Sequence, residues 1–197
     1  MIIAIVLAAG LSTRMGRPKQ TLSVSGKSML QRVLETFRQT KVDGVVVVLG
    51  ANEREVRNKV RFEKERVIVN SEYAKGMSGS LKLGLAATAH DADAVIVALA
   101  DQPLLRAATV DRLIKAHLNS KASIVVPVYN GKRGNPVLFD RSLFPQIMKI
   151  QGDVGAKSVV RKNEDVVLEV SVPDEGVLID LDTPQDYRKI LKGVSGL

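Results

Sequence analysis

An apolar run at the start of the chain leads directly into a loop that is rich in glycine and cations. Residues Ile2–Leu7 read I-I-A-I-V-L, and the segment from Leu7 to Lys19 reads L-A-A-G-L-S-T-R-M-G-R-P-K. Glycine lets the backbone approach a ligand closely, and free backbone N–H groups in such a loop attract negative charge. Arg14 adds a planar cationic fork and Lys19 a point charge. We therefore expect a buried strand followed by an anion-binding loop, with a nucleoside triphosphate as the natural occupant.

Apolar runs alternate with amphipathic stretches along most of the chain. The runs predicted as strands are 2–7, 44–49, 67–69, 94–99 and 124–128, and the predicted helices are 28–38, 53–61, 78–89 and 109–118. Several runs are β-branched without polar alternation, as expected for parallel strands that are covered on both faces. Asn52 and Thr109 are expected to cap the helices that follow them. The pattern predicts an α/β fold with a doubly wound, mostly parallel sheet.

The last third of the chain follows the alternation less regularly. It contains predicted strands at 135–139 and 166–170, and predicted helices at 141–149, 155–161 and 183–191, the last with Pro184 in its first turn. No linker, repeat or low-complexity segment interrupts it. We expect residues 1–197 to form one domain.

Composition narrows the class of protein. The chain has no cysteine, which excludes disulfides and thiolate metal sites, and its apolar runs are too short for a membrane span. The apolar start is interpreted as a strand and not as a signal peptide, so a cytoplasmic location is expected. The net charge of +8 comes from scattered side chains, and aromatic residues make up only 4%. This favours an anionic small-molecule substrate over nucleic acid.

Acidic residues follow two apolar runs. Asp101 comes directly after the run 94–99, where open α/β sheets bind ligands, and a carboxylate there suits Mg²⁺. Asp180 and Asp182 share one side of an extended segment, and either could supply a second metal ligand. Helix capping is the alternative role for these residues. His90 and His117 have no metal-ligand or catalytic-triad partner at a characteristic spacing, and they are interpreted as structural or surface residues.

Three further segments are polar turns. Asn70–Ser80 reads N-S-E-Y-A-K-G-M-S-G-S, and its small residues would let an anion approach a helix N-terminus. A glycine-rich loop with a serine cap explains that segment equally well. The turns at 133–136 and 152–156 indicate by themselves only a change of chain direction.

Taken together, these segments resemble the molybdenum-cofactor nucleotidyltransferase family. The shared patterns are L-A-A-G-x-S-x-R-M-G-x-x-K from Leu7, N-x-x-x-x-x-G-x-x-x-S from Asn70, A-D-Q-P from Ala100, R-G-N-P-V from Arg133, G-D-x-G-A from Gly152 and D-x-D-T-P-x-D from Asp180. Among its branches the chain looks most like the molybdopterin cytidylyltransferases, because Ala9 stands where guanylyltransferases usually carry glycine. A methyl group there could disfavour a purine base.

The resemblance implies a Rossmann-like, mostly parallel fold of the nucleotide-diphospho-sugar transferase type. It also implies Mg²⁺-dependent transfer of CMP from CTP to the terminal phosphate of molybdopterin, with release of pyrophosphate and with a molybdoenzyme as a possible recipient of the product. The residues to which it assigns roles are, for catalysis, Lys19, Arg14 and Asp101; for nucleotide binding, Leu7, Ala8, Ala9, Gly10, Ser12, Arg14, Met15, Gly16, Lys19, Asn70, Gly76, Ser80 and Ala100; for acceptor binding, Arg133, Gly134, Asn135, Pro136, Gly152, Asp153 and Gly155; and for the metal, Asp101 and Asp182.

Other functions stay open at this point. A guanylyltransferase or a sugar-phosphate nucleotidyltransferase would use the same motifs. A nucleotide-binding chaperone for a molybdoenzyme could keep the pocket without catalysis, although the presence of Lys19, Asp101 and Asp182 argues against it. A dinucleotide-dependent oxidoreductase is disfavoured because the first loop is not G-x-G-x-x-G, and the Walker pattern is absent as well. The sequence does not determine the oligomeric state.

Overall fold

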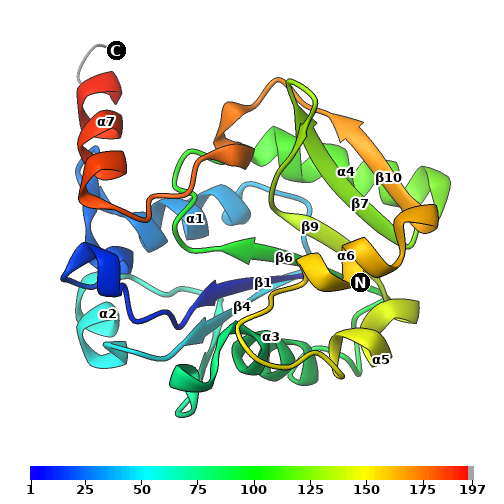
Figure 1. Ribbon diagram of the computed structural model, residues 1–197, viewed down its shortest axis with the longest axis horizontal. Helices are drawn as coiled ribbons and strands as arrows, with labels where there is room; N and C mark the ends of the chain where they lie inside the picture. The colour runs from blue at the N-terminus through cyan, green and yellow to red at the C-terminus, as the bar shows by residue number, and fades with distance from the viewer. Residues whose placement is uncertain (195–197) are drawn as a thin grey trace.

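β1 (Ile2–Ala8) is an inner strand of an eight-stranded sheet in the computed structural model, which describes residues 1–194 (Figure 1). The strands lie in the order β10-β7-β9-β6-β1-β4-β5, and β8 pairs with β7. The bounds of the other strands are Gly44–Leu49 for β4, Arg66–Val69 for β5, Ala94–Leu99 for β6, Ile124–Tyr129 for β7, Lys132–Arg133 for β8, Val137–Asp140 for β9 and Val167–Ser171 for β10. Strand β9 runs antiparallel to both β6 and β7, whereas β1 is parallel to β4 and β6. The mostly parallel α/β fold is confirmed.

Side chains of β1 alternate between two apolar layers, one on each face of the sheet. Ala4 and Val6 pack in one layer, and Ile3 and Ile5 pack in the other. The first layer is covered by α1 (Met29–Arg38), α2 (Glu53–Lys59) and α4 (Ala107–Ser120), and the second by α3 (Met77–Ala86), α5 (Phe144–Ile147) and α6 (Lys157–Lys162). Because β1 is buried on both faces, all seven of its residues are apolar.

A smaller apolar cluster lies beside the sheet. It joins the hairpin of β2 (Ser23–Val24) and β3 (Lys27–Ser28) to α7 (Pro184–Val194). Its buried members are Met15, Leu22, Val24, Met29 and Leu181. The Tyr187 hydroxyl donates a 2.5 Å hydrogen bond to the Ser23 carbonyl oxygen. The cluster therefore attaches the C-terminal helix to the segment that follows the first loop.

Helix capping differs from the sequence prediction at two positions. Asn52 precedes α2, but it adopts a left-handed conformation with φ of 61° and its side chain caps nothing. Thr109 is not the cap of α4, because the helix begins at Ala107 and Thr109 lies within its first turn. The donor groups there are bound by Asp174, which accepts hydrogen bonds from Arg106 N and Thr109 Oγ1 at 3.0 and 2.6 Å. A residue distant in sequence therefore anchors the start of α4.

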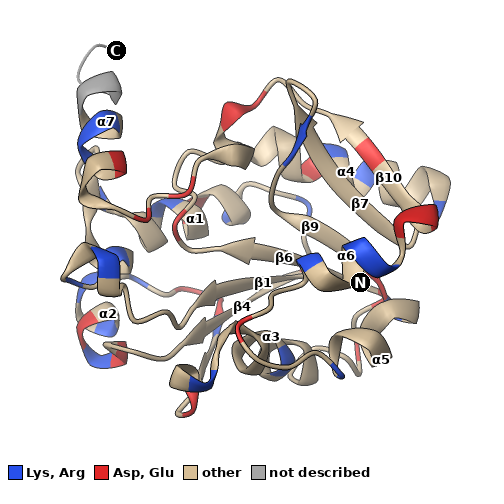
Figure 2. Ribbon diagram, in the orientation of Figure 1, with Lys and Arg blue, Asp and Glu red and all other residues tan. Residues whose placement is uncertain are grey.

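Several predicted element bounds also change. The predicted helix 141–149 is a 3₁₀ turn, Arg141–Leu143, followed by the short α5. The strand predicted from 135 begins at Val137, and the Asn135–Pro136 peptide bond before it is cis. Within residues 1–194 no helix is both long and apolar enough to cross a membrane. Figure 2 shows Lys and Arg spread over α3, α4, α6 and α7, as their scatter in the sequence predicts.

Candidate functional site

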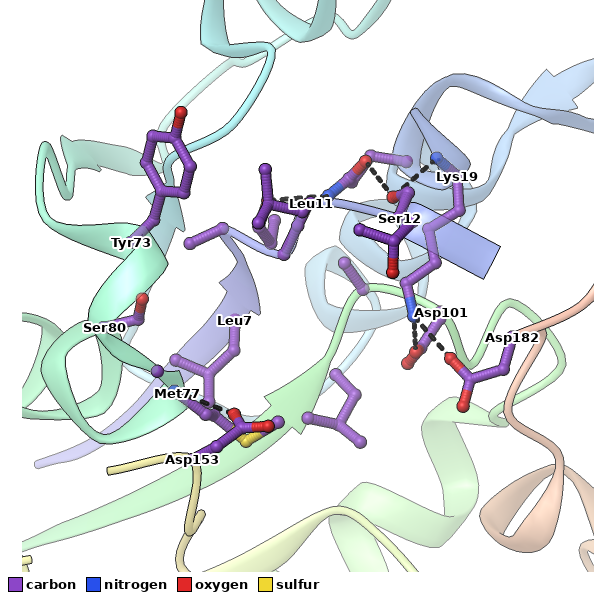
Figure 3. A pocket seen from close by; sticks show the side chains of 18 of the residues that line it. Leu7, Leu11, Ser12, Lys19, Tyr73, Met77, Ser80, Asp101, Asp153 and Asp182 are labelled. Atoms are coloured by element: carbon purple, nitrogen blue, oxygen red, sulfur yellow. Dashed lines mark hydrogen bonds and ion pairs between the residues drawn. The ribbon is translucent and has the colours of Figure 1, made fainter. Parts of the chain in front are cut away.

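The carboxyl ends of β1 and β6 open into a cleft of about 460 Å³ (Figure 3). Parallel strands of an open α/β sheet commonly present ligand-binding loops at this edge. The lining comes from distant parts of the chain: Leu7, Ala8, Ala9, Gly10, Leu11, Ser12, Thr13, Arg14, Lys19, Gln20, Tyr73, Ala74, Lys75, Gly76, Met77, Ser80, Leu99, Ala100, Asp101, Asp153 and Asp182. Most of the predicted nucleotide-binding residues therefore lie together.

The carbonyl groups of the loop after β1 are bound by donors of the chain itself. The buried Gln20 amide donates hydrogen bonds to the carbonyl oxygens of Ala8 and Gly10 at 2.9 and 3.1 Å. Ala51 N donates to the Ala9 carbonyl oxygen at 3.2 Å. In the described part of the chain, no acceptor binds the N–H groups of Gly10, Leu11 or Ser12. The loop thus keeps free donors beside the cleft, which suits an anion.

Ser12 links this loop to Lys19. Ser12 has a left-handed conformation with φ of 55°, and its hydroxyl oxygen accepts a 3.0 Å hydrogen bond from Lys19 N. Lys19 begins the 3₁₀ turn Lys19–Thr21, which also carries Gln20. The same turn therefore orders the loop backbone and presents the lysine side chain.

The Lys19 ammonium contacts carboxylates from two distant segments (Figure 3). It forms an ion pair with Asp101 Oδ2, and a second ion pair with Asp182 Oδ1 at 2.8 Å. Arg14 Nη2 contacts the other oxygen of Asp182 at 3.0 Å. Leu181 N donates to the Asp101 carbonyl oxygen at 3.0 Å, which holds the C-terminal segment against the end of β6. The convergence expected from the sequence is present.

Ion pairing shifts the pKa values of Lys19 and Asp182. Burial disfavours the Lys19 ammonium, but attraction and hydrogen bonds from Asp101 and Asp182 outweigh burial and raise the pKa of Lys19 above its usual value. Burial likewise favours the neutral form of Asp182, yet Lys19 and Arg14 hold the pKa of that carboxyl below its usual value. Each partner therefore stabilises the charged form of the other.

The two carboxylates that contact Lys19 have the chemistry of ligands for a divalent cation. Asp101 Oδ1 is buried and has no hydrogen-bond partner in the described chain, which leaves one oxygen free for a cation. Residues 1–194 contain no group of three or more acidic, His or Cys side chains arranged for a metal. Mg²⁺ typically needs only one or two carboxylates when phosphate and water complete its shell. The site fits a cation that binds together with a phosphorylated ligand.

Asp180 occupies a different place from Asp182. Its Oδ1 accepts a 2.8 Å hydrogen bond from the Gln102 amide, and it is absent from the cleft lining. Burial, followed by the negative charge of Asp101, raises the pKa of Asp180 above its usual value. Of the two acidic residues that the sequence left as alternatives, Asp182 is the one that reaches Lys19.

The segment 70–80 contributes to the cleft and to its support. Gly76 and Ser80 line the cleft, whereas the buried Asn70 lies behind it and donates a 3.0 Å hydrogen bond from Nδ2 to Ser80 Oγ. Tyr73 and Met77 also line the cleft (Figure 3), although the sequence analysis did not single them out. No periodic signal marks them, because they lie in a 3₁₀ turn and at a helix start.

The two predicted acceptor turns lie in different places. Asp153 lines the cleft and accepts a 3.2 Å hydrogen bond from Met77 N, and Gly152 packs against Gly76. Gly76 has φ of 108°, and a Cβ there would lie 2.6 Å from the Gly152 carbonyl carbon. Gly155 is not in the lining, although it packs beside Met77.

The turn at 133–136 does not reach the cleft lining. The Arg133 guanidinium binds Glu169 at 2.6 Å and Glu164 at 2.8 Å, and these pairs raise its pKa. Gly134 and Asn135 lie against the 3₁₀ turn Glu175–Leu178, with Asn135 N bound to Val177 O at 2.9 Å, and Pro136 follows through a cis peptide bond. Besides Asn70, two more predicted nucleotide-binding residues lie outside the lining, namely Met15 in the small apolar cluster and Gly16.

Comparisons with known proteins agree with this geometry. The chain is 33% identical over 199 residues to nicotine blue oxidoreductase of Paenarthrobacter nicotinovorans, covering 96% of each chain. It is 24% identical to molybdenum cofactor cytidylyltransferase of Escherichia coli (strain K12), covering 94% of this chain and 93% of that protein. The crystal structure of Rv0371c from Mycobacterium tuberculosis has a TM-score of 0.88 and 32% identity, covering 97% of each chain. A structure of Rv0371C in complex with manganese has a TM-score of 0.84 and 31% identity, covering 97% of this chain and 98% of that one.

The family comparison covers most of the chain. The model of the MobA-like NTP transferase domain matches residues 4–166, which include the first loop, the lysine and the acidic residue after β6. This match spans the sheet from β1 nearly to β10. The chain therefore belongs to the MobA-like NTP transferase family, a family of nucleotidyltransferases.

Proposed function

We propose that this chain transfers CMP from CTP to the terminal phosphate of molybdopterin and releases pyrophosphate. The observation that carries the proposal is the meeting of the glycine loop, Lys19, Asp101 and Asp182 in one cleft. We further propose that residues 1–197 act as one domain in the cytoplasm, with no nucleic-acid partner. Phosphoryl transfer needs positioning and neutralisation of charge, and this cleft offers groups for both.

The residues divide this work between them. The unpaired N–H groups of the loop would hold the triphosphate, and Arg14 and Lys19 would offset the negative charge on its phosphates. The acceptor phosphate is already ionised, so no side chain has to act as nucleophile. Its oxygen forms a bond to the α-phosphorus of CTP while the bond from that phosphorus to the bridging oxygen of pyrophosphate breaks.

Asp101 and Asp182 would hold Mg²⁺ beside the phosphates. The unpartnered, buried Asp101 Oδ1 supports this assignment, as does the manganese complex of Rv0371C, a related protein. When bound, such an ion supplies Lewis-acid polarisation of the phosphate oxygens. Asp182 is already oriented by Arg14, so the chain fixes this carboxylate independently of any ligand.

Selection of CTP is proposed to come from Ala9. Its side chain is buried beside Gly50, where an added Cβ would lie 2.8 Å from Ala9 Cβ and 2.7 Å from Tyr73 Cβ. Ala9 lines the cleft, and Gly50 packs closely behind it, so this part of the cleft wall has little room to move back for a larger purine base. The E. coli relative named molybdenum cofactor cytidylyltransferase supports the same choice of nucleotide.

The acceptor side of the site is proposed to involve both predicted turns. Asp153 lines the cleft, while Gly152 packs against Gly76 and Gly155 packs beside Met77, so this turn can contact the acceptor through Asp153. Arg133 would reach the acceptor only after leaving its ion pairs with Glu164 and Glu169, and Gly134, Asn135 and Pro136 would shape that edge. Transfer of the product to a molybdoenzyme is part of the same proposal.

The deciding experiment measures pyrophosphate release with each of the four nucleoside triphosphates, with and without molybdopterin. Release with CTP that depends on molybdopterin is expected, and an Ala9→Gly variant should gain activity with GTP relative to CTP. Preference for GTP or for a sugar-phosphate acceptor would assign the activity to those alternatives. Isothermal titration showing tight Mg·CTP binding without pyrophosphate release would instead identify a non-catalytic binding protein.

The relative named nicotine blue oxidoreductase suggests one further experiment. The protein is titrated with NADH and NADPH, and their oxidation is measured with a quinonoid dye as acceptor. We expect no turnover, because ion-paired Lys19 and Asp101 serve a metal-bound triphosphate and have no evident role in hydride transfer. Saturable oxidation of either cofactor would contradict the proposed transferase function.

A further inference from the structure

Lys19 occupies the position between the two carboxylates that the proposed function assigns to a divalent cation. Its ammonium contacts Asp101 Oδ2 and Asp182 Oδ1, and Arg14 contacts Asp182 Oδ2. Three of the four carboxylate oxygens are therefore already paired with cationic groups of the chain. Of these four oxygens, Asp101 Oδ1 alone has no partner among the described residues.

The charges of this cluster cancel. Arg14 and Lys19 are positive, Asp101 and Asp182 are negative, and the side chains of Lys19, Asp101 and Asp182 are only 17%, 12% and 31% exposed. Partial burial strengthens each attraction relative to water. A free divalent cation that entered between Asp101 and Asp182 would find their charges already balanced by Arg14 and Lys19, with Asp180 as a further carboxylate nearby, and it would meet the Lys19 ammonium at close range.

A triphosphate changes this balance. Its phosphates would bring several negative charges to the loop that carries Arg14 and precedes Lys19. In this loop the N–H groups of Gly10 and Leu11 have no acceptor within the described part of the chain. The lysine side chain is long and single-bonded throughout, so its ammonium can exchange carboxylate partners for phosphate oxygens while its backbone stays in place. The Ser12 hydroxyl would continue to hold Lys19 N.

We propose that Lys19 is an internal stand-in cation that keeps free divalent metal out of the Asp101–Asp182 pair until a triphosphate draws it away. The inference rests on the proposed binding of a nucleotide and a cation in this cleft, and it adds an order to their binding. Metal and nucleotide then bind cooperatively, and linkage requires each to tighten the other by the same factor. The protein alone is a poor metal site, and the nucleotide complex is a good one.

The test measures binding of Mn²⁺ to the intact protein by the loss of the free-ion electron paramagnetic resonance signal, without any nucleotide. Wild-type protein should bind Mn²⁺ weakly. Lys19→Met, which removes the charge and keeps a long side chain, should bind Mn²⁺ at least about tenfold tighter, since a tenfold change is well within the coupling range of such sites. Lys19→Arg keeps the charge and should bind as weakly as the wild type.

Two controls separate local from global effects of charge. Lys27→Met removes the same charge from an exposed lysine paired with Glu35 outside the cleft, and it should leave Mn²⁺ binding unchanged. Adding Asp101→Asn to Lys19→Met should abolish the gain. The proposal is overturned if Lys19→Met binds Mn²⁺ no tighter than wild type, or if Lys27→Met gives an equal gain.

Cooperativity supplies a second readout. Equilibrium dialysis with α,β-methylene-CTP, which cannot release pyrophosphate, should show tighter binding when Mn²⁺ is present, and Lys19→Met should lose most of that difference. An undiminished difference in Lys19→Met would contradict the inference. Neither measurement needs turnover. Absence of pyrophosphate release with CTP would therefore refute the proposed reaction and leave the inference about Lys19 and metal binding unaffected.

Discussion

Lys19 and Asp182 are separated by 163 residues in the chain, and their side chains form an ion pair of 2.8 Å. Asp101 shares the same ammonium, so the site joins the first loop, the end of β6 and the segment before α7. None of these segments can form the arrangement alone. Substitutions at the meeting point should therefore affect activity far more than they affect the fold.

Asp101→Ala should reduce transferase turnover by about 100- to 1000-fold, the size of loss that follows removal of one group that stabilises developing charge. The reason is that Asp101 carries the unpartnered oxygen assigned to the metal. The measurement is pyrophosphate release at saturating Mg²⁺, with the thermal unfolding midpoint as a check of the fold. Asp91→Ala, at a side chain that is 66% exposed, is the control and should be fully active. Turnover of Asp101→Ala near the wild-type value would show that the metal assignment is wrong.

Lys19→Ala should weaken binding of the triphosphate or slow the chemical step by about 100-fold or more, because a charge that stabilises the transition state is removed. Single-turnover kinetics with CTP separate the two effects. Lys27→Ala serves as the matched control, since that lysine pairs with Glu35 on the surface. Unchanged rate and affinity in Lys19→Ala would place this lysine outside the reaction.

Gln20→Leu should weaken nucleotide binding although Gln20 offers no charge to it. The substitution removes the amide that binds the Ala8 and Gly10 carbonyl oxygens, and it leaves them near the cleft without a donor. A buried polar group without a partner costs about 1–3 kcal/mol, so both the free energy of unfolding and the loop geometry should suffer. Urea unfolding and the KM for CTP report the two effects. A Gln20→Leu protein with wild-type stability and KM would show that the loop keeps its conformation without the hydrogen bonds from Gln20.

What the sequence predicts well depends on how locally each feature is determined. The strand Ile2–Ala8, its glycine loop and the acidic residue after β6 are adjacent in sequence to the elements that place them, and the structure has them where expected. Gln20 was not identified, because a buried amide within a polar loop looks like any surface glutamine until its partners are known. Arg133 illustrates the same limit: its partners Glu164 and Glu169 lie more than thirty residues away, and only the packing of β10 beside β7 brings them near.

Asp174→Ala should lower the free energy of unfolding by about 1–3 kcal/mol, because it leaves the donors at the start of α4 without their buried acceptor. Asp174 is 2% exposed and accepts hydrogen bonds from Arg106 N, Thr109 Oγ1 and Gly176 N. Denaturant unfolding measures the loss, and Asp174→Asn, which keeps an acceptor oxygen, should recover part of it. A larger loss of stability in Thr109→Val than in Asp174→Ala would show that Thr109, and not Asp174, stabilises the start of α4.

The Arg38–Glu65 ion pair should make stability depend on acidic pH. Burial favours the neutral form of Glu65, but Arg38, at 2.7 Å, and the Glu63 N–H outweigh it and hold the pKa of Glu65 below its usual value. A carboxyl whose pKa is lowered by folding adds stability above its unfolded-state pKa of about 4.3, and that stability is lost as the pH falls through the folded-state pKa.

Glu65→Gln tests this dependence directly. At neutral pH the variant should be less stable than wild type by about 1.5–3 kcal/mol, the range for a hydrogen bond to a charged group. Below about pH 4.3 the difference should shrink, because the wild-type carboxyl becomes protonated and loses the same attraction. Urea unfolding at a series of pH values measures it, with Glu72→Gln, at a side chain that is 65% exposed, as the control. A difference between Glu65→Gln and wild type that stays constant from neutral to acidic pH would mean that the charge of Glu65 does not contribute to the stability of the fold.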